Sequence, residues 1–288
     1  MLLMTYPPHR NASSRCGFQI AYNFINLQTH IQPSAQHMNE AVALNNRGVR
    51  HLRMCQHGDA ISMFRQALMI ARQLLPPEPP QARVDISPND RYVKHDQPAS
   101  LDGIDDDIPV IPLTSLVVLD DADDNESHFV EHTAVHIQVY RRAIVLPQVR
   151  NDTDVPLVAY CFVYLFNLAI ANHLHAMSIE VSHPSLADDH FAGATLLYGL
   201  AQELLLRDRI ISVDITIFLA LANNQGALHK RRDDAEESHR CFVSVQTMLM
   251  LLLGRTGGAS VGRHFEGFFV NVANELIIPR AVKGASAA

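Results

Sequence analysis

The stretch from Met38 to Leu75, MNEAVALNNRGVRHLRMCQHGDAISMFRQALMIARQLL, decides the predicted fold. Its apolar and small residues recur at intervals of three and four, which is the period of an amphipathic α-helix. The period breaks at Gln56-His57-Gly58, where glycine ends a first helix and Asp59 can cap a second, and it stops at Pro76-Pro77. The stretch therefore predicts a hairpin of two helices.

The rest of the chain divides by composition. Proline and aspartate dominate residues 76–112, β-branched residues alternate around residues 135–139, and the helical period returns at Leu157 and persists to about Ile278. We therefore expect a mostly irregular N-terminal segment (1–36), a first helix pair (37–75), a Pro/Asp-rich insertion with a β-hairpin (76–156), further helix pairs with a capping helix (157–280), and a tail (281–288).

A short motif recurs in the middle of four predicted helices: an asparagine, any residue, and then a small residue. The four copies are Asn46-Arg47-Gly48, Asn167-Leu168-Ala169, Asn224-Gln225-Gly226 and Asn271-Val272-Ala273. After the first three, a second helix places an aromatic residue between small or branched ones. These sets are Ala60, Phe64 and Ala67; Ala194, Tyr198 and Ala201; and Ser238, Phe242 and Val245. A small residue on one helix lets the second helix approach closely, so the pattern predicts tightly packed pairs.

This pattern resembles the tetratricopeptide repeat, most closely over residues 41–70. The resemblance implies an all-α superhelix of antiparallel helix pairs, here interrupted by a long acidic loop with short β-strands. Leu44 and Ala222 stand at the family's tryptophan position, and Cys55 and Asp233 stand where a turn glycine is common. The chain would therefore be a diverged member, and its insertion leaves open whether the groove is continuous.

The resemblance also implies which residues pack the repeats and which contact a partner. First helices line the concave face in this family, so the implied partner-binding groove consists of Asn45, Val49, Arg53, Asn223, Ala227, Lys230 and Arg231. The implied repeat-packing residues are Gly48, Ala60, Phe64, Ala67, Ala169, Ala194, Tyr198, Ala201, Gly226, Ser238 and Phe242. The lysine-rich clamp of chaperone-binding members has no match, since Val42 and Ala220 occupy early groove positions.

Composition narrows the class of partner. The formal net charge is −7, from 23 lysines and arginines against 30 acidic residues, and this balance offers no general attraction for nucleic acid or anionic lipid. Four scattered cysteines and the lack of a secretory signal predict an intracellular protein, cytoplasmic or nuclear. We expect no cofactor, and a protein or peptide as the partner.

One histidine series suggests a different class of function. His128, His132 and His136 recur every four residues, which is a spacing that can bind zinc, although a solvated histidine-rich edge gives the same pattern. The sequence therefore predicts a non-catalytic interaction module, with a histidine-dependent metal hydrolase as the alternative. A third reading makes the acidic segment 100–127 a docking element for a basic partner.

Overall fold

The computed structural model describes residues 35–74, 128–149, 155–207, 215–256 and 265–277. Within these residues the protein is mostly helical, with seven α-helices and one two-stranded sheet. The predicted all-α class is confirmed at this level. The N-terminal segment, the Pro/Asp-rich stretch up to residue 127 and the tail lie outside the described residues, as does the acidic docking segment.

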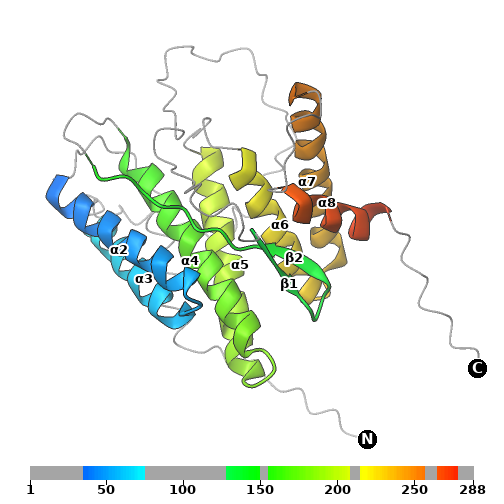
Figure 1. The fold of residues 1–288 in the computed structure, drawn as a ribbon, viewed down its shortest axis with the longest axis horizontal. Helices are drawn as coiled ribbons and strands as arrows, with labels where there is room; N and C mark the ends of the chain where they lie inside the picture. The colour runs from blue at the N-terminus through cyan, green and yellow to red at the C-terminus, as the bar shows by residue number, and fades with distance from the viewer. Residues whose placement is uncertain (1–34, 75–127, 150–154, 208–214, 257–264, 278–288) are drawn as a thin grey trace, which may run out of the picture.

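Six of the helices form three hairpins. They are α2 (Ala35–Arg53) with α3 (His57–Gln73), α4 (Leu157–Ile179) with α5 (Pro184–Arg207), and α6 (Ile215–Arg231) with α7 (Ala235–Thr256). α3 also packs against α4, and α5 packs less extensively against α6, so the hairpins lie in chain order (Figure 1). The short helix α8 (Glu266–Val272), continued by the π-helical turn η3 (Ala273–Ile277), contacts α7.

Glycine and aromatic residues pack the first and third hairpins in the same way. A Cβ atom added to Gly48 would lie 2.6 Å from the Phe64 ring, and one added to Gly226 would lie 2.9 Å from the Phe242 ring. Both distances are too short for a side chain, so only glycine allows each ring to seat against the facing helix. In the second hairpin Ala169 takes the place of glycine, and it is fully buried.

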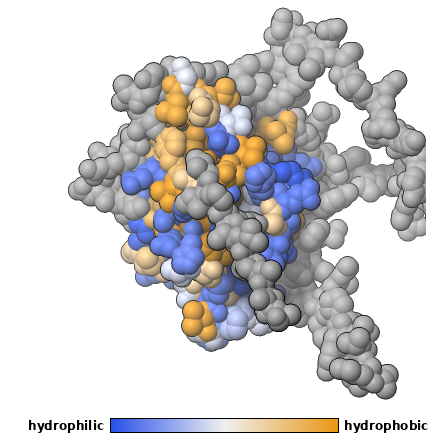
Figure 2. Space-filling model, turned by 90° about the vertical axis from the view of Figure 1, so that its right-hand side faces the viewer, coloured by the Kyte–Doolittle hydropathy of each residue, from blue (hydrophilic) through white to orange (hydrophobic). Residues whose placement is uncertain are grey.

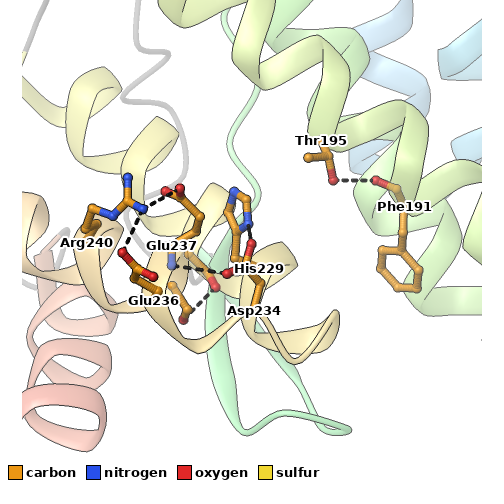
Figure 3. Close-up of polar contacts among 9 residues, drawn as sticks. Phe191, Thr195, His229, Asp234, Glu236, Glu237 and Arg240 are labelled. Atoms are coloured by element: carbon orange, nitrogen blue, oxygen red, sulfur yellow. Dashed lines mark hydrogen bonds and ion pairs between the residues drawn. The ribbon is translucent and has the colours of Figure 1, made fainter.

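The turns of these two hairpins also correspond. Cys55 and Asp233 have φ values of 57° and 59° and so adopt the left-handed conformation. His51 Nδ1 lies 2.7 Å from Gln56 Oε1, and His229 Nδ1 lies 3.1 Å from Asp234 Oδ2 (Figure 3). Each turn is therefore fastened by a histidine near the end of the first helix.

Helix α4 forms the centre of the stack. It is the one helix in the described part of the chain that is long and apolar enough to cross a membrane, and 89% of its most apolar window is buried inside the protein. Its neighbours on either side are α3 and α5. The apolar character of α4 is that of a core helix in this fold.

A β-hairpin precedes α4 and leads into an extended segment. β1 (Phe129–His132) pairs antiparallel with β2 (Ile137–Tyr140), with Phe129 opposite Tyr140 and His132 opposite Ile137. From β2 the chain continues to residue 149 across the face of the helices, from α6 towards α2 (Figure 1). We call residues 137–149 the strap.

Candidate functional site: an asparagine-lined groove

The strap lies against the first helix of every hairpin and against α8, and asparagine side chains hold its main chain. At each of five strap residues, one asparagine side chain from a helix bonds to both backbone groups. Its Oδ1 accepts a hydrogen bond from the backbone N–H, and its Nδ2 donates one to the backbone C=O. The pairs are Gln138 with Asn271, Tyr140 with Asn224, Ile144 with Asn167, Leu146 with Asn46, and Val149 with Asn39. The N–H bonds measure 2.7 to 2.9 Å and the C=O bonds 2.7 to 3.2 Å.

Asparagine suits this task because its side chain carries an acceptor and two donors in one plane. In an extended chain the N–H and C=O of one residue point to the same side, as they do towards a neighbouring strand in a sheet. The carboxamide thus takes the place of a strand partner and satisfies backbone groups that would otherwise be buried without hydrogen bonds. These contacts involve the main chain of the strap only.

Four of these asparagines, together with Asn45 and Asn223, form two equivalent units. The first asparagine triad comprises Asn45, Asn46 and Asn167, and the second comprises Asn223, Asn224 and Asn271. In addition to the pairs above, Asn45 donates to the Ile144 carbonyl at 3.1 Å, and Asn223 donates to the Gln138 carbonyl at 2.8 Å. Each triad therefore places two carboxamides on one carbonyl and a third on the residue two positions later.

The hydrogen bonds within the triads follow the same scheme. In the first triad Asn167 donates to Asn45 at 2.9 Å, and Asn45 donates to Asn46 at 3.2 Å. In the second triad Asn271 donates to Asn223 at 2.6 Å, and Asn223 donates to Asn224 at 3.2 Å. The same arrangement thus occurs twice along the strap, built each time from two adjacent asparagines and a third, which comes from α4 in the first triad and from α8 in the second.

The strap also buries apolar side chains between its asparagine contacts. The residues concerned are Ile137, Val139, Tyr140, Ala143, Ile144 and Leu146, each at most 8% exposed. Around β2, the Tyr140 ring stacks on Phe268 at a centroid distance of 5.8 Å, and Phe129 meets both rings edge-on. Main-chain hydrogen bonds and apolar burial therefore act together.

The residues predicted to line the groove lie in different environments. Asn45 and Asn223 belong to the triads and are completely buried against the strap. Val49 and Ala227 are also almost completely buried, so neither is exposed for a partner in this arrangement. Arg53 lies exposed in the last turn of α2.

Lys230 and Arg231 are engaged within the chain. Lys230 forms an ion pair with Glu275 of η3. The Arg231 guanidinium bonds to Glu180 at 2.8 Å and to Asp188 at 2.7 Å, and it lies 3.9 Å from the centroid of the Phe191 ring. These two cations therefore join α6 to its neighbouring elements in this arrangement.

The three candidate metal-binding histidines point to separate partners. His132 is buried, stacks on Phe191 and bonds through Nε2 to Glu180 at 3.0 Å, whereas exposed His136 lies 3.3 Å from Glu131. His128 lies beside Arg142. In the part of the chain that the structure describes, no three His, Cys, Asp or Glu side chains gather closely enough to hold a metal ion.

A different histidine, His173 of α4, is unusual in its surroundings. It is completely buried, and neither ring nitrogen has a hydrogen-bond partner among the described residues. Burial, reinforced by nearby His132 and Arg231, lowers the pKa of His173 to about 3. The ring packs edge-on against Phe191 and Tyr198, so His173 is a neutral core residue near the hairpin.

Sequence reasoning found the repeated asparagine motif but explained it by its small residue alone. The structure assigns the asparagine of each motif to the strap, and the small residue of the first and third copies to an aromatic ring on the second helix. The sequence signal for these contacts with the strap was an amide side chain at the same position of the motif in four helices. Asn39, one further contact to the strap, lies outside that motif.

No protein-family model, curated protein or solved structure matches this chain. The chain's own geometry is therefore the basis for inferring what it does. The asparagine-lined groove is the feature whose chemistry points to a class of ligand.

Proposed function

We propose that this protein is a tetratricopeptide-like helical-repeat module that binds proteins or peptides in its groove and acts as a non-catalytic scaffold or adaptor. The observation that carries the proposal is the row of five asparagines that form hydrogen bonds with an extended main chain. An extended polypeptide is the ligand whose N–H and C=O groups recur at the spacing that these carboxamides require.

The architecture supports this proposal. Three helical hairpins lie in chain order, and their first helices, together with α8, present the asparagines to one segment. Gly48 against Phe64 and Gly226 against Phe242 repeat the close packing typical of tetratricopeptide hairpins. The groove's polar side chains are neutral carboxamides, which bind main chain but neither take up nor release protons near neutral pH.

Affinity capture from cells tests the proposal with a groove variant and a matched surface control. Asn45→Ala combined with Asn46→Ala removes two members of the first asparagine triad, whereas Gln66→Ala changes an exposed amide on α3. We expect the groove variant, if its circular dichroism is unchanged, to lose proteins that the wild type and the control retain. Capture of the same proteins by all three would contradict the assignment of the groove.

The metal-hydrolase alternative has its own direct test. Elemental analysis of the purified protein shows whether it carries stoichiometric zinc or another transition metal. The positions of His128, His132 and His136 do not favour it, because their side chains contact three different residues.

A further inference from the structure

The two halves of the strap are held differently. The hairpin half, residues 137–140, pairs with β1 and buries Tyr140 between aromatic rings. The open half, residues 143–149, lies beyond the hairpin and is held by the first asparagine triad and Asn39. Among the described residues, a strand, an aromatic cluster and a triad hold the hairpin half. The first triad, Asn39 and two deeply buried side chains, Ile144 and Leu146, hold the open half, where Val145 also forms an isolated β-bridge.

We propose that the open half is an internal ligand, which an extended segment of a partner protein replaces in the groove between α2 and α4. This inference rests on the proposed function. The carboxamides of the first triad and of Asn39 are already bonded to the strap, so a second extended chain can reach them when the open half leaves. The contacts are to main chain, which any extended polypeptide supplies.

The open half specifies the chemistry of the partner segment. The N–H groups of Ile144, Leu146 and Val149 are donated to asparagines, so the partner carries no proline at the matching positions. The buried side chains of Ile144 and Leu146 require large aliphatic residues two positions apart. Pro147 shows that proline fits directly after the second aliphatic residue. The ligand is thus an extended segment of the pattern aliphatic, any residue, aliphatic.

The strap has an advantage over such a segment because it belongs to the same chain. A tethered ligand competes at an effective concentration in the millimolar range for short connections. A free peptide should therefore bind the wild type weakly and bind better once the strap itself is weakened. Substitutions in the strap change the internal ligand and leave the groove asparagines unchanged. They therefore test the ligand independently of its binding site.

The test uses a fluorescent peptide with the sequence of residues 141–149, RRAIVLPQV, and fluorescence anisotropy. The strap variant carries Ile144→Ala and Leu146→Ala, and circular dichroism checks that it is folded. We expect it to bind the peptide at least tenfold more tightly than the wild type. A peptide with Ile144→Asp and Leu146→Asp should not bind, and adding Asn46→Ala to the strap variant should weaken binding of the original peptide.

Equal peptide affinity for the wild type and the folded strap variant would overturn the inference. Dimers of the strap variant in size-exclusion chromatography with light scattering would also overturn it, because a second copy of the chain would then fill the groove. Affinity capture is a separate readout: capture of the same proteins by the wild type and by the Asn45→Ala, Asn46→Ala variant would contradict the proposed function, whereas the peptide titration tests only whether the open half is exchanged.

Amide hydrogen exchange of the wild type tests the same inference without substitution. If the open half leaves the groove while the rest stays folded, the amides of Ile144 and Leu146 should exchange at least tenfold faster than that of Tyr140. Equal exchange at all three amides would mean that the strap leaves only on global unfolding, and the inference would fail.

Discussion

The first and second asparagine triads make the same hydrogen bonds, but their surroundings differ. Asn224 of the second triad is completely buried and also donates to the Tyr198 hydroxyl at 2.9 Å, whereas its counterpart Asn46 is partly exposed. The second triad binds a strand that β1 already pairs, and the first binds the strap beyond the hairpin. The same chemical unit is therefore buried more completely at the hairpin than beyond it, and the difference lies at Asn224 and Asn46.

The largest expected effect concerns the helix pairs that carry the triads. Phe64→Ala and Phe242→Ala each remove a fully buried ring seated against a glycine, and each should lower the free energy of unfolding by about 3–5 kcal/mol. Urea unfolding measures both losses. A loss within about 0.5 kcal/mol would contradict the packing, and clearly unequal losses would contradict the equivalence of the two hairpins.

The next largest losses of stability are expected from substitutions in the two triads, and they should differ between the triads. Asn224→Ala leaves the buried N–H and C=O of Tyr140 and the Tyr198 hydroxyl without this partner and should cost about 3 kcal/mol. Asn46→Ala should cost about 1 kcal/mol, because water can reach the partly exposed site. Unfolding of both variants in urea checks the order. A larger loss for Asn46→Ala would reverse the comparison between the two triads.

Acid should act at the hairpin end of the strap, through His173. Its pKa is lowered to about 3 in the folded protein and returns to about 6.5 on unfolding, so the unfolded state binds the extra proton between these values. Stability from this residue is therefore complete well above pH 6.5 and falls as the pH drops through that value, by about 1.4 kcal/mol at pH 5.5.

The variant His173→Phe should reduce the difference in unfolding free energy between pH 7.5 and pH 5.5 by about that amount. Phenylalanine keeps an aromatic ring among Phe191 and Tyr198 but does not titrate. The remaining pH dependence would include His57, His175 and His190, whose pKa values burial also lowers. An unchanged pH dependence in the variant would exclude His173 as the source.

The smallest expected effect is at the turns that join the two matched hairpins. His51→Ala and His229→Ala each remove one side-chain hydrogen bond, which is exposed at the first turn and partly buried at the second, and each should cost about 0.5 kcal/mol. Thermal unfolding of the two variants side by side is the measurement. A loss of several kcal/mol in one of them would show that its turn does more than close the hairpin.

One hydrophobic surface remains beyond the groove, on the side of the molecule where α7 and α8 lie. Hydrophobic and hydrophilic residues share this face, with the hydrophobic ones concentrated in its upper part (Figure 2). On α7, Met250 and Leu251 are 64% and 60% exposed. The last hairpin thus leaves apolar side chains uncovered by the described residues.

Local periodicity was enough to predict the helices and their close contacts. Packing residues such as Gly48 and Phe64 can be recognised in the sequence because helix packing depends on neighbours at fixed, short spacing. The turn positions Cys55 and Asp233 were also expected from the repeated pattern, and both have a positive φ. These features are encoded within about 30 residues of each other.

The strap could not be predicted in the same way. Its contacts join residues far apart in the chain, such as Asn46 with Leu146 and Gln138 with Asn271, and no local pattern specifies which segment lies in the groove. The sequence predicted a β-hairpin within residues 76–156 and a strand near Ile137, but not that Phe129–His132 is the partner of this strand.

The most direct test of the account is residue-resolved amide hydrogen exchange on the wild type and on Asn46→Ala. If carboxamides hold the strap, the substitution should remove the protection of the Leu146 amide and leave that of Tyr140, which Asn224 holds, unchanged. Equal protection of the Leu146 amide in both proteins would contradict the claim that asparagine side chains bind the strap.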